Sequence, residues 1–247
     1  MTVHTPDEEV EFGDAWVYES IVGALPWIDL SDRMAVVLQF LLFEFGIVVL
    51  AWIYDLWMAA LAGSVAVLVA TIGSAFMLNL GNQIRGLQAP ESYRRLLFGS
   101  SIEVVLSLLA YVGLLTYLFV YDPRTGGSLL TELLGERPPL PVVYLMLLIL
   151  WDVCYRIGTG WWAAVAALFR SLQYRFDTDV TAGYRRIDRR NAGFAVVQLS
   201  LVPLVWGYPL LVGALVGHVI AVLVVVAASL WLLGRSEPRD VDGSTFP

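Results

Sequence analysis

Long uninterrupted apolar runs are the feature that most limits how this chain can fold. They extend over roughly residues 33–55, 58–80, 99–121, 141–169, 192–207 and 209–233. A helix needs about 20 predominantly apolar residues to cross a hydrocarbon layer of ~30 Å. The fifth run is short, and Pro203 within it is expected to kink it. The sequence therefore predicts an all-α integral membrane bundle of about six transmembrane helices.

The composition leaves little room for a separate soluble domain. Hydrophobic residues make up 58% of the 247 and charged residues 15%, with a mean hydropathy of +0.72, whereas about one-quarter of a soluble domain is charged. The expected organisation is an acidic N-terminal tail (1–32), a six-helix domain (33–233) and a polar C-terminal tail (234–247). Within the first tail, residues 10–25 predict either an interfacial amphipathic helix or a partly ordered segment.

The placement of arginine predicts the orientation, because short cytoplasmic loops of membrane proteins are enriched in basic residues. All 15 basic residues are arginine, and most lie in residues 81–98, 170–191 and the C-terminal tail. Six spans put these segments on one side, so both termini are expected in the cytoplasm and the protein in the plasma membrane. The arginines expected to anchor that side to lipid headgroups are Arg94, Arg95, Arg185, Arg186, Arg189 and Arg190.

Five charged or histidine residues lie inside the apolar runs, away from the ends of the runs: Glu44, Glu103, Asp152, Arg156 and His218. A charge at the bilayer centre costs about 2.5–3.5 kcal/mol on insertion scales, so such a residue is expected to face protein and to have a partner or a role. Asp152 and Arg156 share one helical face and can pair, and pairing of Arg156 with Glu103 or Glu44 is also allowed. Three carboxylates outnumber one guanidinium, so at least one, with Glu44 the first choice, is expected to be protonated or compensated by a cation.

Two functions are compatible with this candidate polar network. In the first, the chain is a non-enzymatic membrane component or accessory subunit, and the buried charges hold helices together. In the second, it is a small ion- or proton-coupled transporter or channel that uses Glu44, Asp152, Arg156 and His218. Hydration separates the two, because transport needs a water-accessible cavity that reaches Glu44 or Asp152.

Residue types exclude several classes of membrane enzyme. There is no lysine for a retinal Schiff base, and only two histidines, of which one lies in a span, too few for a bis-histidine haem or a three-histidine metal site. Catalytic and nucleotide-binding motifs are absent. We therefore expect no enzyme activity and no cofactor.

Aspartates lie between the arginines of residues 170–191, which argues against binding of nucleic acid. The expected partners are the lipid bilayer and a second copy or another membrane protein.

Small residues recur every four positions on two predicted helices. The first set is Ala62, Ala66, Ala70 and Ser74, and the second is Gly213, Gly217 and Ala221. Such faces let helices approach closely, either within the chain or between two copies. Separately, Tyr-Arg-Arg occurs at 93–95 and at 184–186, which indicates either duplication of a helical hairpin or independent lipid anchoring.

The lysine-free, acidic composition, with a net charge of −7, accompanies two distinctive segments, YRRLLFGS at 93–100 and WDVCYRIGTGWW at 151–162. Together they resemble uncharacterised multi-pass membrane proteins of salt-loving archaea. The resemblance spans most of the chain and implies a multi-pass membrane fold. It implies no known activity and no functional residues.

Overall fold

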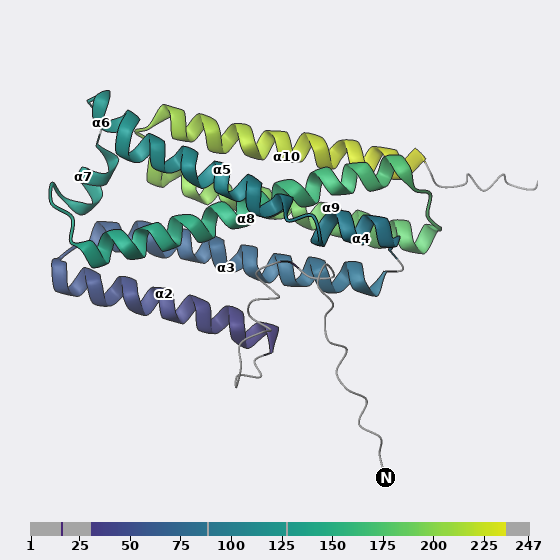
Figure 1. Cartoon of the computed structure of the whole chain (residues 1–247), viewed down its shortest axis with the longest axis horizontal. Helices are drawn as coiled ribbons and strands as arrows, with labels where there is room; N and C mark the ends of the chain where they lie inside the picture. Colours follow the sequence, from purple (N-terminus) through teal and green to yellow (C-terminus); the bar gives the residue numbers. More distant parts are fainter. Residues whose placement is uncertain (1–15, 17–30, 88, 127, 236–247) are drawn as a thin grey trace, which may run out of the picture.

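The computed structural model describes residue 16 and residues 31–87, 89–126 and 128–235, and none of these residues lies in a strand. In this described part of the chain six long helices lie side by side in one bundle (Figure 1): α2 (Asp32–Tyr54), α3 (Trp57–Gly86), α5 (Ile102–Thr116), α8 (Leu140–Gln173), α9 (Thr178–Val197) and α10 (Pro209–Arg235). The shorter elements are α4 (Glu91–Phe98), the π-helix η1 (Tyr117–Tyr121), α6 (Asp122–Arg124), α7 (Leu129–Leu134) and the 3₁₀-helix η2 (Gln198–Val205). The predicted all-α fold is confirmed.

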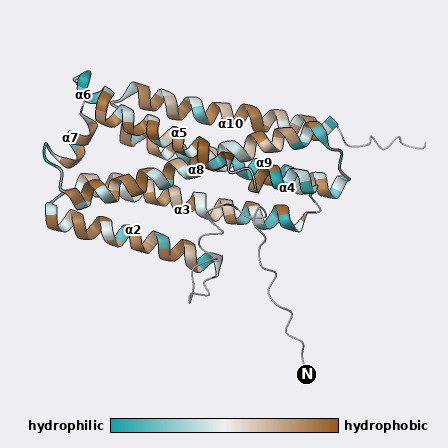
Figure 2. Ribbon diagram, viewed as in Figure 1, coloured by the Kyte–Doolittle hydropathy of each residue, from teal (hydrophilic) through white to brown (hydrophobic). Residues whose placement is uncertain are grey.

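Within the described part of the chain, five helical segments are long and apolar enough to cross a membrane. They are Arg33–Tyr54, Trp57–Gly86, Glu91–Arg124, Leu140–Gln173 and Pro209–Arg235. Large apolar side chains are exposed on their outer faces, as Phe45 on α2 and Val224 on α10 show at 69% and 62% exposure. Figure 2 shows hydrophobic residues along the length of these helices. Such a surface is compatible with lipid as the surrounding solvent.

The segment expected as the fifth span differs from the prediction. Instead of a helix over 192–207, α9 begins at Thr178 and continues into η2, and this stretch is not among the five apolar segments. Tyr184, Ile187 and Asn191 are buried along one face of α9, while Arg186 faces out. An amphipathic helix of this kind contains no continuous apolar run, so its start was missed.

The longest helix, α8, lies at the centre of the bundle. It contacts α2, α3, α5, α9 and α10 as well as the short α4. Its buried face is rich in small residues, including Gly158, Gly160, Ala163 and Ala164. Small side chains let neighbouring backbones approach closely, which explains how one helix contacts so many others.

Figure 1 places the end of α3, α4, the start of α9 and the end of α10 at one end of the bundle. The turn between α2 and α3, together with α6 and α7, lies at the other end. The arginine-bearing connections within 81–98 and 170–191 therefore lie at the same end of the molecule, which we call the arginine end.

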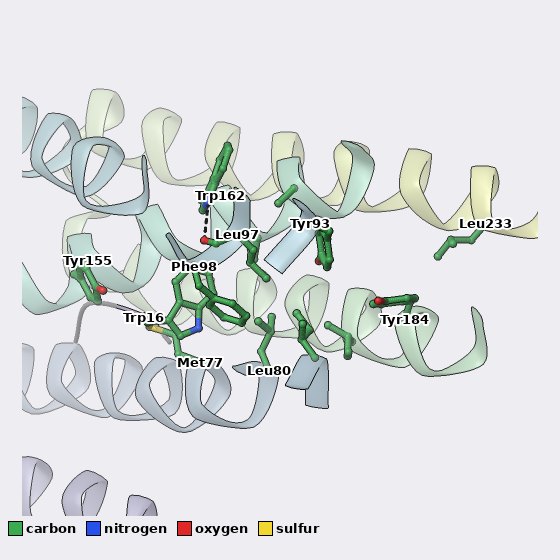
Figure 3. Packing of buried hydrophobic residues seen from close by; sticks show 14 residues of the cluster. Trp16, Met77, Leu80, Tyr93, Leu97, Phe98, Tyr155, Trp162, Tyr184 and Leu233 are labelled. Atoms are coloured by element: carbon green, nitrogen blue, oxygen red, sulfur yellow. Dashed lines mark hydrogen bonds between the residues drawn. The ribbon is translucent and has the colours of Figure 1, made fainter. Parts of the chain in front are cut away.

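Aromatic and aliphatic side chains form a core between α3, α4, α8 and α9 (Figure 3). Trp162 Nε1 donates a hydrogen bond to the carbonyl of Leu97, with a distance of 3.1 Å, and so ties α8 to α4. Trp16 is 1% exposed, and its ring meets Phe98 edge-on with the centroids 4.9 Å apart. Apart from Trp16, the segment 10–25 for which an interfacial helix was predicted lies outside the described residues.

Candidate functional site

The predicted pair of Asp152 and Arg156 forms on the buried face of α8. Arg156 Nη2 lies 2.9 Å from Asp152 Oδ1, and the side chains are 1% and 11% exposed. The other carboxylate oxygen, Oδ2, accepts a hydrogen bond of 2.7 Å from Gln39 Nε2 on α2. Ser74 Oγ on α3 lies 3.3 Å from Gln39 Oε1 and donates to it. Both oxygens of Asp152 thus have a partner, and the cluster, which we call the Asp152 network, joins α2, α3 and α8.

The side chain of Arg156 passes close to Gly73 of α3, and its guanidinium reaches another residue of the same helix. Arg156 Nη1 lies 3.0 Å from Met77 Sδ, and its Cζ lies 5.3 Å from the centre of the Tyr155 ring. A Cβ atom on Gly73 would lie 2.8 Å from Cβ and Cγ of Arg156 and 2.8 Å from Phe194 Cζ. A larger residue at position 73 would collide with both side chains, so glycine is needed where α3 packs against them.

Gly73→Ala is expected to lower the free energy of unfolding by about 1–2 kcal/mol, because the added methyl group overpacks the contact between α3 and α8. Unfolding followed by circular dichroism in detergent measures the change. Gly86→Ala is the control on the same helix, since a Cβ there would meet no atom within 4 Å. If the two variants were equally stable, the space between Gly73 and Arg156 would have to be larger than it is in the structure.

The other three candidate residues lie apart from the Asp152 network. Glu44 accepts a hydrogen bond of 2.9 Å from Ser64 Oγ on α3. Glu103 is fully buried, and neither of its carboxylate oxygens has a hydrogen-bond partner among the described residues. The His218 ring on α10 packs against Trp161, with the centroids 6.1 Å apart. Arg156 pairs with Asp152, and no ion pair joins it to Glu44 or Glu103 in the described part of the chain. The protonation of Glu44, or its compensation by a cation, stays a prediction.

A second buried ion pair joins α8 to α9 at the arginine end. Arg170 Nη2 lies 2.8 Å from Asp188 Oδ2, with the side chains 0% and 1% exposed. Ser229 Oγ on α10 donates to the same carboxylate oxygen over 2.8 Å and lies 2.9 Å from the Ser171 hydroxyl. This cluster, which we call the Arg170 network, therefore holds three helices.

The two Tyr-Arg-Arg motifs meet in the Arg170 network. Arg170 Cζ lies 4.1 Å from the ring centre of Tyr184 and 5.6 Å from that of Tyr93. Arg170 Nη1 donates to the Tyr93 hydroxyl, at 3.4 Å. A guanidinium over the face of an aromatic ring is attracted by the electrons of the ring. The repeated tyrosines thus stabilise one shared cation, a role that the sequence did not indicate.

Sequence reasoning missed the Arg170 network because residues 170–191 were interpreted as a lipid-facing loop. One signal was available. Tyr184, Ile187, Asp188 and Asn191 follow a spacing of three or four residues, which is that of one helical face. That spacing would have indicated a buried aspartate in need of a cation.

Residues 11–229 match a protein family described as a family of unknown function, DUF7530. The chain belongs to this family. The matched region contains every residue of both networks, with Ser229 as its last position. No curated protein matches the chain, and no solved structure matches it. The description of the family names no activity, in agreement with the resemblance seen in the sequence. A salt-loving source organism stays a prediction.

The six arginines that were predicted to anchor the chain to lipid headgroups lie at the arginine end. Arg94 and Arg95 pair with Glu91, at 3.1 Å and 2.6 Å. The other four extend from α9, where Arg185, Arg186, Arg189 and Arg190 surround a surface pocket together with Ala182. Arg186, Arg189 and Arg190 are exposed, so their charges are available to an anionic surface.

The two small-residue stripes differ in what they contact. On α3, Ala70 and Ser74 are buried in the bundle, whereas Ala62 and Ala66 line a cavity. On α10, a Cβ on Gly213 or Gly217 would meet no atom within 4 Å, and Ala221 is partly buried. Close approach of another helix within the described chain therefore does not explain Gly213 and Gly217.

Proposed function

We propose that this chain is a non-enzymatic structural or accessory component of the plasma membrane, in which the buried charges hold the helices together. The observation that carries the proposal is the saturation of Asp152: Arg156 and Gln39 occupy both of its oxygens. Asp188 also has two fixed partners, Arg170 and Ser229, which both contact its oxygen Oδ2. A carboxylate held by fixed partners is poorly suited to exchange protons or cations.

The same proposal includes six passes with both termini in the cytoplasm. The helical stretch of α9 and η2 supports a sixth pass, because η2 is mostly apolar and leads through the turn at 206–208 into α10. The shared end of the arginine-bearing connections supports their location on the cytoplasmic side. The exposed arginines of α9 would then lie against lipid headgroups.

The proposal assigns neither a cofactor nor a catalytic centre to the chain. Its partners are the lipid bilayer and a second copy or another membrane protein, and nucleic acid is not among them. The exposed glycines of α10 are compatible with such a neighbour, because they leave room for a helix to approach.

One observation favours the second candidate, a small ion- or proton-coupled transporter. Glu103 is fully buried without a hydrogen-bond partner in the described part of the chain, and an isolated carboxyl group is the type that carries a proton. It lies outside the Asp152 network, however, so the polar residues do not form one continuous path.

Thiol labelling decides between the two candidates. In a Cys154→Ser background, Ser74→Cys introduces a thiol at a fully buried position of the Asp152 network. We expect no reaction with a membrane-impermeant maleimide from either side of the membrane, because the structural role requires these groups to be dry. Rapid reaction at this position would support transport and contradict the proposal.

Two exposed positions serve as controls and also test the topology. Ala182→Cys lies among the arginines of α9, and Thr125→Cys follows α6 at the opposite end. We expect Ala182→Cys to react only from the cytoplasmic side and Thr125→Cys only from the outside. Labelling of both from one side would contradict the proposed topology.

A further inference from the structure

An apolar cavity of about 620 Å³ lies in the part of the bundle away from the arginine end. Its walls come from α2, α3, α5, η1, α8, η2 and α10. The short helix α7 covers it with four leucines, Leu129, Leu130, Leu133 and Leu134. The volume is within the range of small-molecule binding sites, which are mostly apolar with a few polar groups.

The exposed part of the cavity lining lies on α5 and α10. The exposed residues of its lining are Leu109, Ala110 and Gly113 on α5 and Leu210 and Ala214 on α10. Both helices belong to the apolar segments that are long enough to span a membrane. In a membrane the cavity would therefore be accessible from hydrocarbon, and its apolar walls offer water too few hydrogen bonds to fill it.

His218 gives the cavity one strong hydrogen-bonding group. It lies roughly 13 Å along α10 from the start of the helix, at 1.5 Å per residue. Its ring packs against Trp161 and makes no hydrogen bond with any described residue. The two other polar side chains of the lining, Tyr117 and Cys154, are a phenol and a weakly polar thiol.

We propose that this cavity binds a long-chain lipid that carries a single hydroxyl or carbonyl oxygen, with the chain in the apolar space and the oxygen hydrogen-bonded to His218. Apolar walls select a hydrocarbon chain. A plain hydrocarbon would leave the imidazole without a partner, whereas one oxygen satisfies it. This site is independent of the structural role proposed above, since it shares no residue with either charge network.

Photolabelling in lipid vesicles tests the site. The probe is a diazirine derivative of hexadecanol, and the competitors are hexadecanol and hexadecane. We expect labelling of α5 and α10 in the wild-type protein, with hexadecanol the better competitor by about tenfold, the worth of one hydrogen bond. His218→Leu should retain the labelling and lose that preference.

Matched glycine variants separate the cavity from the rest of the apolar surface. Gly113 lines the cavity and Gly213 does not, yet a Cβ at either would meet no atom within 4 Å. Gly113→Phe is expected to fill the cavity and abolish labelling, and Gly213→Phe to leave it unchanged. Ala214→Phe, on the α10 side of the opening, should repeat the loss.

Three results would overturn the proposal. The first is undiminished labelling in both Gly113→Phe and Ala214→Phe. The second is equal competition by hexadecane and hexadecanol in the wild-type protein, which would indicate a plain hydrocarbon chain as the occupant. The third is labelling spread evenly over all apolar helices, which would indicate the general lipid-facing surface.

Discussion

Asp188→Asn is expected to lower the free energy of unfolding by about 3–5 kcal/mol, the largest effect of any single substitution considered for this chain. The carboxylate and the Arg170 guanidinium lie 2.8 Å apart and are 1% and 0% exposed. Removing one partner of a buried pair leaves an uncompensated buried charge, which is far more costly than losing an exposed pair. Reversible unfolding in mixed detergent micelles measures the change.

Two further variants test whether the loss of stability comes from the unpaired charge of Arg170 or from any substitution at the arginine end. The double variant Arg170→Met with Asp188→Leu is expected to recover most of the lost stability, since apolar residues of similar volume often replace a buried pair without penalty. Ser229 still has Ser171 and the Ala167 carbonyl as partners. Glu91→Gln, in an exposed pair, should change stability by less than about 1 kcal/mol. A double variant as unstable as Asp188→Asn would contradict this explanation.

The helical architecture could be predicted because it depends on local properties of the chain. An apolar run of about 20 residues indicates a spanning helix from local sequence alone, and the spacing of Asp152 and Arg156 places the two side chains on one helical face, where they can pair. The start of α9 was lost because its buried residues alternate with arginines, as in the stretch from Tyr184 to Asn191. In this stretch the spacing of the buried residues indicates a helix packed in the bundle, whereas the mean hydropathy does not.

The choice of partners between helices could not be predicted, because it depends on how the helices rotate and cross. By depth alone Arg156 could meet Glu44, Glu103 or Asp152. In the structure it pairs with Asp152, and the first atoms of its side chain lie against Gly73. Gln39 on α2 donates to Asp152 on α8, and nothing in the sequence indicated that these two residues meet. Arg170 and Asp188 belong to different helices, and only the packing of α8 against α9 brings them together.

The two charge networks and the cavity lie at different positions along α8. Arg156 and Arg170 are separated by roughly 21 Å along this helix, at 1.5 Å per residue, and each is held by a carboxylate. Beyond Arg156, away from the arginine end, α8 presents apolar residues such as Leu145 and Ile149 to the cavity. The charged half is thus locked by fixed partners, and the apolar half has room for a ligand.

Gly158→Ala is expected to lower the free energy of unfolding by about 3 kcal/mol, because α5 and α8 cannot remain in contact around the added methyl group. A Cβ on Gly158 would lie 2.7 Å from the backbone nitrogen of Ser107 and 2.9 Å from its Cα. Cβ atoms in proteins essentially never approach so closely, and backbone atoms cannot move aside as a side chain can. The helices must separate, at the upper end of the cost of overpacking.

Gly160→Ala provides the matched comparison, because it lies on the same helix and its nearest neighbour would be Asn191 Oδ1 at 3.4 Å, close to ordinary contact. It is expected to be neutral or slightly stabilising, since alanine favours a helix over glycine. Adding Ser107→Gly to Gly158→Ala removes the hydroxyl but not the backbone atoms, so stability should recover only in part. Full recovery would mean that the hydroxyl alone is the obstacle and that α5 and α8 lie further apart than the structure has them.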